Sequence, residues 1–178
     1  MSRKVDMEKL LISGRNLIAA EMLCNEIGNT KERILDDKLV PVLEKFAKDN
    51  KLTLNYDTAY SKRFSGFYFA RSSWDKKYNI GFEFQEKNYN SLIFGIHLID
   101  GKKPSASPKE QEQLHKLFSD SKKNKTKYWP WWSFFDDDKY NNWNAYMFIS
   151  IYNNPNEIAN LLIDKTSEIL EKIDSMKL

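Results

Sequence analysis

The sequence has little of several residues and patterns that mark whole classes of protein. It holds one cysteine in 178 residues, so no disulfide can form within the chain. No apolar run approaches the roughly 18 residues that a membrane-spanning helix needs. Only 6 glycines and 5 prolines are present, and no internal repeat or low-complexity linker is visible. With 41% hydrophobic and 14% aromatic residues, the chain is expected to form one globular domain over residues 1–178.

The sequence motifs of the common enzyme classes are also missing. The chain has no P-loop, no GxGxxG after a predicted strand, no GxSxG and no HExxH. It has no spaced set of cysteines and histidines for zinc. The acidic run Asp136–Asp138 lacks the alternating ligands and the glycine of a calcium loop. These patterns therefore predict no metal site and no cofactor.

The cysteine and the first residues bear on the cellular compartment. Cys24 lies beside Met22, Leu23 and Ile27, which predicts a helix side chain that is packed inward and chemically inert. The first residues are polar and lack the apolar segment of a secretory signal. We therefore expect a cytoplasmic protein with no membrane among its partners.

Positive charge is concentrated in one stretch of the chain. The whole sequence has 28 Lys+Arg and 25 Asp+Glu, and this net charge of +3 does not by itself indicate a nucleic-acid partner. Residues 101–130 carry eight lysines and three acidic residues. Four of these lysines stand directly before an aromatic segment: Lys122, Lys123, Lys125 and Lys127. Such a run is most often a solvated surface, and the alternative is a stripe that contacts phosphates.

Two stretches near the N-terminus have the apolar spacing of helices. The first covers residues 6–27, and Gly28 and Asn29 are expected to end it. The second begins with Thr30 as its N-cap and continues to about residue 49, with Pro41 requiring a kink or a break. Residues 1–50 are therefore predicted to be the helical part of the domain.

A sheet is predicted after residue 51, where the apolar period changes from that of a helix to that of a strand. Apolar and polar residues alternate in four segments, 52–57, 67–70, 80–85 and 92–99, and short polar connections favour antiparallel neighbours. Capping patterns at residues 107–110 and 154–157 predict two more helices, the second of them long. The expected fold is α+β, with a four-stranded antiparallel meander (residues 51–100) packed against the N-terminal helices and a long C-terminal helix. Residues 101–178 are expected to contain the basic segment, the Trp-rich loop and this C-terminal helix.

Four of the five tryptophans cluster within fifteen positions: Trp129, Trp131, Trp132 and Trp143. One interpretation is an exposed platform on which bases or sugars stack, with the preceding lysines neutralising phosphates. The other is a loop wedged onto the sheet, with each indole N–H bonded to a backbone acceptor. Because large aromatic side chains are on average well buried, the second interpretation is favoured. The pattern of residues 128–152 predicts no particular secondary structure.

A second group of candidate residues lies on the predicted central hairpin. Its polar face is expected to carry three side chains: Glu83, Gln85 and His97. If the five-residue turn pairs Phe84 with Leu92, Gly81 lies opposite Gly95 and leaves an open strip that a ligand can approach. A glutamate beside a histidine can act as an acid and a base or bind a metal. A lone histidine on a strand is more often an ordinary surface or hydrogen-bonded residue.

The aromatic segment and one strand carry a family resemblance. The pattern consists of Trp129-Pro130-Trp131-Trp132, residues 134–136 and 140–143, Asn154-Pro155 with the helix after it, and the strand Gly81-Phe82-Glu83-Phe84. It resembles the C-terminal region of PD-(D/E)XK nuclease-like proteins from bacteria and phages, over about half of the chain. In that family the nuclease core lies mostly upstream of this region, and this chain has little room for it.

The resemblance also implies which residues a nuclease would need. Such nucleases hold Mg²⁺ with an Asp on one strand and an acidic residue plus Lys on the next, and the metal activates water. The nearest residues here are Asp57, Glu83, Gln85, Glu86 and Lys87. Gln85 stands where the family has Lys, and Glu86 and Lys87 are adjacent instead of separated by one residue. The resemblance therefore implies a nuclease-associated accessory domain more than a nuclease.

These observations together predict a non-catalytic binding domain that engages nucleic acid or a protein, such as a separate nuclease. The alternatives are a nuclease with a degenerate active site, for which alone Mg²⁺ is expected, and a small inhibitor or assembly protein from a mobile element. The expected binding residues are Lys122, Lys123, Lys125, Lys127, Trp129, Trp131, Trp132 and Trp143. The catalytic candidates are Asp57, Glu83, Gln85, Lys87 and His97.

Overall fold

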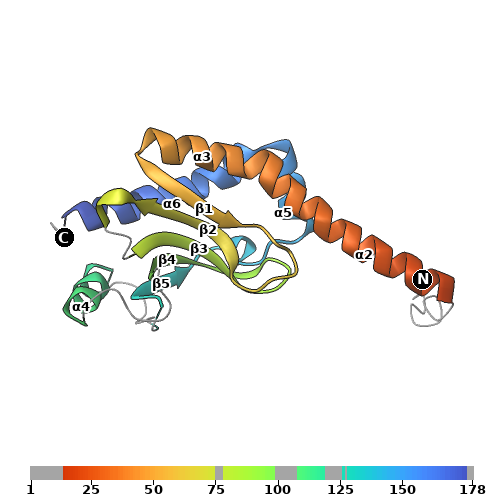
Figure 1. Cartoon of the computed structure of the whole chain (residues 1–178), viewed down its shortest axis with the longest axis horizontal. Coiled ribbons are helices and arrows are strands. Elements are labelled where there is room, and N and C mark those ends of the chain that lie inside the picture. The colour runs from red at the N-terminus through yellow and green to blue at the C-terminus, as the bar shows by residue number, and fades with distance from the viewer. Residues whose placement is uncertain (1–13, 75–77, 99–107, 119–125, 127, 176–178) are drawn as a thin grey trace.

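The computed structural model describes residues 14–74, 78–98, 108–118, 126 and 128–175. Within them the chain forms an α+β fold, as predicted, with one antiparallel sheet and helices before and after it (Figure 1). The helices are α2 (Gly14–Ile34), the π-helical turn η1 (Leu35–Leu39), α3 (Val40–Asp49), α4 (Pro108–Leu117), α5 (Ala145–Asn153) and α6 (Pro155–Ser175), with short 3-10 turns η2 (Ser72–Trp74) and η3 (Asp138–Tyr140). Among the described residues, no helix combines the length and the apolar character that a membrane crossing requires.

The sheet has five strands instead of the four predicted. They follow each other in chain order: β1 (Leu52–Asp57), β2 (Ser65–Arg71), β3 (Tyr78–Glu86), β4 (Asn90–Leu98) and β5 (Trp131–Phe134). The first four are the predicted meander. The fifth comes from the tryptophan-rich segment and pairs with β4, so that Trp131 lies opposite Ile96 and Trp132 opposite Gly95.

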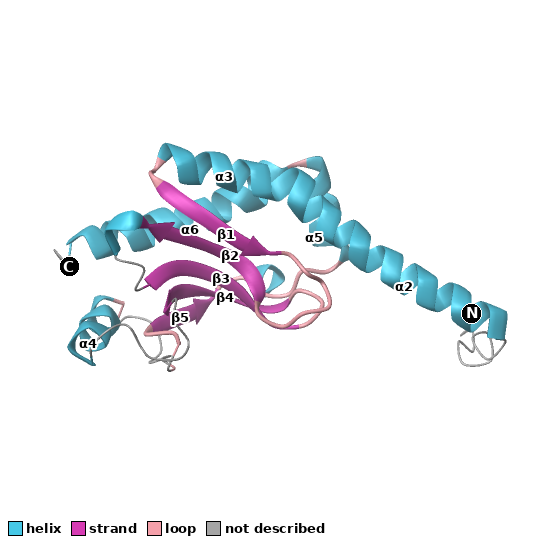
Figure 2. Ribbon diagram, viewed as in Figure 1, coloured by secondary structure: helices cyan, strands magenta, loops and turns pink. Residues whose placement is uncertain are grey.

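Helices cover one face of this sheet (Figure 2). Alternate strand residues point toward α3 and α6 and are buried, because side chains in a strand point to opposite faces in turn. Their aromatic rings pack on each other, as Phe82 does against Phe69 and Phe94. The buried strand residues of this face include Phe67, Phe69, Ile80, Phe82, Phe84, Leu92, Phe94, Ile96 and Trp131. The hydrophobic core therefore lies between the sheet and the helices, and these helices do not cover the other face of the sheet.

The N-terminal helical region differs from the prediction at Gly28 and Thr30, whereas the interruption expected near Pro41 is present as the π-helical turn η1 directly before α3. Gly28 does not end a helix, and Thr30 is not a cap, because α2 continues unbroken to Ile34. The glycine instead allows a close approach of the Tyr60 ring, since a Cβ at Gly28 would lie 2.8 Å from Tyr60 Cδ1. Pro41 follows the π-helical turn and lies in the first turn of α3, where its missing N–H costs no helical hydrogen bond.

The prediction that Cys24 is packed inward is wrong. Figure 1 shows that α2 extends beyond the sheet, so this part of the helix does not pack on the sheet layer. Cys24 is exposed, and its apolar neighbours Ile18, Met22, Leu23 and Ile27 are each more than half exposed. The sequence spacing identified a helix correctly but could not show that the helix overhangs the sheet.

The exposure of Cys24 leads to a simple expected result. In the folded protein, a chromogenic disulfide reagent should modify one thiol per chain at a rate close to that measured in denaturant, because Cys24 is exposed in the described part of the chain. The Cys24→Ser variant is the control and should give no reaction. A thiol that reacts only after unfolding would contradict the placement of α2.

Candidate binding cavity on the open face of the sheet

The predicted pairing of the central hairpin is confirmed. Phe84 pairs with Leu92 and Gly81 with Gly95, so the side chains of residues 83, 85 and 97 lie on the face of the sheet that the helices do not cover. The glycines leave room for a neighbouring ring, as the Trp129 ring shows: a Cβ at Gly81 would lie 2.9 Å from its Cη2 atom. Gly81 therefore allows the Trp129 ring to lie directly against the backbone, whereas a residue larger than glycine at position 81 would exclude this ring.

A cavity of about 640 Å³ lies on this open face. Its volume is in the range of small-molecule and side-chain binding sites in proteins, roughly 300–1,000 Å³. Residues from β3, β4 and β5, and from the chain before β2 and β5, line it: Phe64, Glu83, Gln85, Ser91, Ile93, His97, Leu98, Thr126, Tyr128, Trp129, Trp132 and Phe134. The described lining is thus rich in aromatic rings, with one carboxylate and without Lys or Arg.

Glu83 is the acidic group of the cavity. Its side chain is only 6% exposed. The Tyr68 hydroxyl donates a hydrogen bond to Oε2 (2.5 Å), and the Gln85 amide donates one to Oε1 (2.8 Å). Burial raises the pKa of Glu83, against the smaller lowering effect of these two bonds. Burial and the nearby Glu83 carboxylate also raise the pKa of Tyr68.

His97 and Trp132 each contribute one buried polar atom that has no hydrogen-bond partner in the described part of the chain. The His97 ring packs between Trp129 (4.8 Å between ring centroids) and Tyr68 (5.4 Å). Burial lowers the pKa of His97 to about 4, so this imidazole is neutral at pH 7. Among the described residues, neither His97 Nδ1 nor Trp132 Nε1 has a hydrogen-bond partner, although both atoms are buried. Buried polar atoms are nearly always bonded in folded proteins, so these two atoms are exceptions, and both belong to residues that line the cavity.

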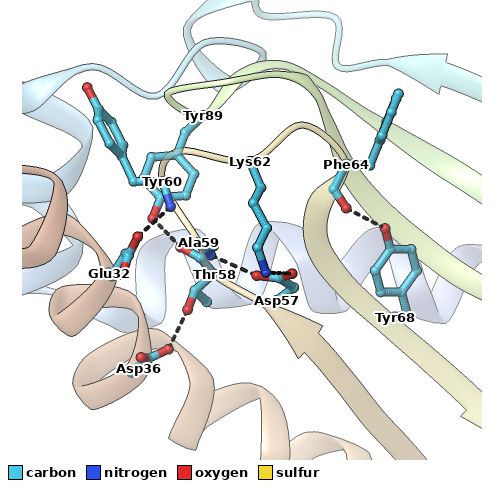
Figure 3. Close-up of polar contacts among 10 residues, drawn as sticks. All are labelled: Glu32, Asp36, Asp57, Thr58, Ala59, Tyr60, Lys62, Phe64, Tyr68 and Tyr89. Atoms are coloured by element: carbon cyan, nitrogen blue, oxygen red, sulfur yellow. Dashed lines mark hydrogen bonds and ion pairs between the residues drawn. The ribbon is translucent and has the colours of Figure 1, made fainter.

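Phe64 lines the cavity with an exposed ring and a strained backbone. Its φ of 65° lies in the left-handed region, which a bulky side chain rarely occupies. Its backbone N–H donates to the Phe84 carbonyl (2.8 Å), and its carbonyl oxygen lies 3.3 Å from the Tyr68 hydroxyl oxygen, whose proton is held more closely by Glu83 (Figure 3). The ring itself is 53% exposed. Residues with such strained backbone conformations occur mainly at functional sites, including ligand-binding positions, and they persist only where surrounding contacts hold them in place.

The tryptophans divide between this cavity and the core. Trp129 and Trp132 line the cavity. Trp131 instead stacks on Phe118 at 4.2 Å, and Trp143 is 2% exposed, with its indole N–H bonded to the Tyr140 carbonyl. The burial of Trp131 and Trp143 agrees with the favoured interpretation, in which the rings pack onto the sheet, and does not fit the prediction that these two are binding residues on an exposed platform. Trp131 and Trp132 differ because of strand alternation, which sends neighbouring residues of β5 to opposite faces.

The predicted basic residues cannot be placed in the same way. Lys122, Lys123, Lys125 and Lys127 lie outside the described residues. Thr126, which stands among them, lines the cavity, and its hydroxyl accepts hydrogen bonds from the backbone N–H groups of Tyr128 and Trp129. Thr126 is thus the described residue of this lysine-rich stretch that contributes to the cavity.

The residues expected for a nuclease lie on the open face but do not meet. Asp57 pairs with Gly66, and Gly66 pairs with Glu83, so the two carboxylates are two strands apart, about 10 Å between Cα atoms. Asp57 accepts hydrogen bonds from the Ala59 N–H and from Lys62, which lower its pKa (Figure 3). Lys87 is exposed in the turn after β3. Among the described residues, no group of three acidic, histidine or cysteine side chains could hold a metal ion.

Figure 3 also shows polar contacts that the sequence did not indicate. Glu32 accepts a hydrogen bond from the Tyr60 N–H (2.6 Å), and Asp36 accepts one from the Thr58 hydroxyl (2.7 Å). The Tyr89 hydroxyl donates to the Thr58 carbonyl. These bonds tie α2 and η1 to the connection between β1 and β2, which leads directly to Phe64.

Sequence reasoning missed Tyr68, which bonds Glu83, and several residues that line the cavity, among whose large hydrophobic side chains Phe64 is the most exposed. Tyr68 could have been found, because it faces Gly81 in the register and so shares the face of Glu83. Phe64 lies outside the strands, and no sequence pattern marks its backbone conformation.

Comparison with known proteins adds no family to this geometry. No protein-family model matches the chain. No curated protein and no solved structure matches it significantly either.

Proposed function

We propose that this chain is a non-catalytic binding domain that holds a side chain of a protein partner in the cavity on the open face of its sheet. The observation that carries the proposal is the composition of that cavity: aromatic walls, two buried polar atoms without partners, and no cationic side chain among its described lining residues. Concave, mainly apolar sites with a few converging polar groups are where proteins bind ligands.

The absence of Lys and Arg from the described lining favours a protein partner over a nucleic acid. Binding to a nucleic acid depends on cations that neutralise phosphates. The one charged side chain among the described lining residues is Glu83, and a carboxylate repels phosphate. An apolar or aromatic side chain of a protein, by contrast, gains the burial of its surface against Trp129, Trp132 and Phe134.

The arrangement of the polar groups favours binding over catalysis. Glu83 is held by Tyr68 and Gln85 rather than by His97, so the two groups form no acid–base pair. The second carboxylate of the face, Asp57, is bonded to Lys62. These groups therefore serve better as fixed contacts for a ligand than as proton carriers.

The Trp132→Ala variant tests this proposal. A display library of random peptides is selected on the wild-type protein, and the selected peptides are then measured on each variant. We expect Trp132→Ala to weaken binding about tenfold or more, because it removes a wall of the cavity. The matched control is Tyr146→Ala on α5, which removes an aromatic ring that is 82% exposed and outside the cavity, and which should leave binding unchanged. Equal binding by wild type and Trp132→Ala, with both proteins folded, would contradict the proposal.

A single-stranded nucleic acid is the second candidate. Trp129 and Trp132 do line the cavity, and the lysine-rich residues 122–127 precede them directly in the sequence. Bases stack on such rings without strong sequence preference. Quenching of tryptophan emission by a short oligonucleotide, weakening as salt is raised, would favour this candidate. Flat titrations at low salt would leave the protein partner as the better assignment.

The family resemblance of the aromatic segment extends the proposal to the kind of partner. Because the pattern is similar to the C-terminal region of PD-(D/E)XK nuclease-like proteins, a separate nuclease is the partner to be examined first. The single cysteine, which excludes an internal disulfide, fits a reducing compartment such as the cytoplasm.

A further inference from the structure

We propose that the group bound in the cavity is a cation, an alkylammonium or a guanidinium, held by the Glu83 carboxylate and the surrounding aromatic rings. This inference rests on the proposed function and specifies the chemistry of its ligand.

The first support is the charge of Glu83. Both of its hydrogen-bond partners, Tyr68 and Gln85, are neutral donors, and no described Lys or Arg forms an ion pair with it. A buried carboxylate is costly unless an opposite charge compensates it. Each carboxylate oxygen accepts one bond here and has a further lone pair available. A cationic ligand would therefore supply the missing partner.

The second support is the arrangement of the aromatic rings. The rings of Trp132 and Phe134 stand nearly perpendicular, at 88°, with 5.4 Å between their centroids, and so form a corner of the cavity. Trp129 and Tyr128 line it as well. The faces of aromatic rings attract cations, most strongly for tryptophan and within about 6 Å. Glu83 lines the same cavity as these rings and lies two strands from Phe134, so a cationic ligand that spans the cavity can contact both the carboxylate and the aromatic faces.

The other charged groups near the site do not oppose this assignment. The His97 imidazole is neutral at pH 7 and places no positive charge in the cavity. Lys62 is bonded to Asp57 on the far side of β2. Arg63 lies over the Phe64 ring (5.0 Å) and donates to the Gln85 carbonyl, outside the described lining. When Glu83 is ionised, its carboxylate is the one charge among the described lining residues, and a cationic ligand would neutralise it.

Choline and its neutral carbon isostere, dimethylbutanol, test the proposal, because they have the same shape and differ in charge. Binding is measured by tryptophan emission and by titration calorimetry on the full chain. We expect choline to bind about tenfold or more tightly than dimethylbutanol. Glu83→Gln should remove this preference, because the amide keeps the size of the side chain and lacks its charge.

The matched control is Glu86→Gln, which makes the same change on the same strand at an exposed position. It should leave the preference for choline intact. Thermal unfolding of each variant shows that the protein is folded. If Glu83→Gln does not fold, Trp132→Phe, which keeps an aromatic face but a weaker one, should reduce choline binding more than dimethylbutanol binding.

The source of the cation is distinguished by two further probes. Short peptides that carry arginine or trimethyl-lysine represent a side chain of a protein partner, and the same peptides with citrulline or acetyl-lysine are their neutral counterparts. Tighter binding of the cationic peptides than of choline assigns the cation to a protein partner. Tighter binding of choline assigns it to a small molecule, a result that would support the cationic ligand and contradict the protein partner of the proposed function.

The pH dependence is a further readout. Glu83 is hydrogen-bonded by Tyr68 and Gln85, His97 lines the same cavity, and Asp57 is the next carboxylate on this face. Because the pKa of Glu83 is raised, the group loses its charge as pH falls toward and below its raised pKa, and choline should bind more weakly there. Asp57 stays ionised because its pKa is lowered, and His97 stays neutral until about pH 4. Glu83→Gln should abolish this dependence.

Two results would overturn the inference while leaving the proposed function standing. One is equal affinity for choline and dimethylbutanol, both sensitive to Trp132→Ala. The other is an unchanged preference for choline in Glu83→Gln. By contrast, selected peptides that bind Trp132→Ala as well as wild type would overturn the proposed function itself, and the cation proposal with it.

Discussion

Replacing Trp143 by alanine is expected to lower the free energy of unfolding by about 3–5 kcal/mol, as the truncation of a large core aromatic does. The side chain is 2% exposed and packs edge-on against Phe84, with 5.1 Å between ring centroids. Its ring also approaches Phe67 and Phe148. The variant removes these contacts and leaves the Tyr140 carbonyl without the indole donor. Urea unfolding followed by circular dichroism measures the loss.

Trp132→Ala is the matched control for this change. It removes the same kind of side chain from the same aromatic segment, but from the wall of the cavity rather than from the core. We expect a clearly smaller loss of stability than for Trp143→Ala, together with the loss of ligand binding. Equal losses of stability in the two variants would contradict the division of the tryptophans between core and cavity.

Asn141→Ala is expected to have the second largest effect on stability. The Asn141 side chain is buried and holds both backbone groups of Phe135: Oδ1 accepts from its N–H (2.9 Å), and Nδ2 donates to its carbonyl (3.1 Å). Alanine leaves both groups unpaired, and each buried unpaired group costs about 1–3 kcal/mol. We therefore expect the free energy of unfolding to fall by about 2–5 kcal/mol.

The neighbouring Asn142 provides the control for Asn141. Its side chain accepts one hydrogen bond, from the Ser91 N–H (3.0 Å), and the residue is exposed. Asn142→Ala should cost less than Asn141→Ala in the same urea measurement, because water can replace the lost bond. If the two variants lose the same stability, Asn141 does not hold the chain after β5 in the way described.

The four strands of the meander could be predicted because their sequence alternates with period two. The same alternation fixed the register at Phe84 and Leu92 and placed Glu83, Gln85 and His97 on one face. The fifth strand could not be predicted in this way. In Trp131–Phe134 both faces carry large aromatic residues, because the core covers one side and the cavity the other.

The errors in the helical region have a common physical cause. A sequence period shows which residues share a face of a helix, but not whether another layer covers that face. Cys24 was expected to be buried for this reason, although α2 extends past the sheet. Gly28 was expected to end a helix, and only the tertiary contact with Tyr60 shows why a glycine is used within it.

The cavity could be predicted only in part. Its polar face followed from strand alternation, whereas its walls depend on contacts between distant segments. Trp132 reaches the cavity through the pairing of β5 with β4, and Phe64 through the strained turn before β2. The sequence also could not separate Trp129 and Trp132 from Trp131 and Trp143, because adjacent aromatic residues look alike until the strand that separates them is known.

The most direct test of the cavity as a binding site is an NMR titration of the five indole N–H signals with choline, after assignment by single Trp→Phe variants. We predict that the signals of Trp129 and Trp132 shift together with saturation, while those of Trp74 and Trp143 stay in place, because these two rings are buried outside the cavity. In Glu83→Gln the shifts should be lost at the same choline concentration. Shifts confined to Trp74 or Trp143, or five signals that do not move in the wild-type protein, would contradict the conclusion that choline binds in this cavity.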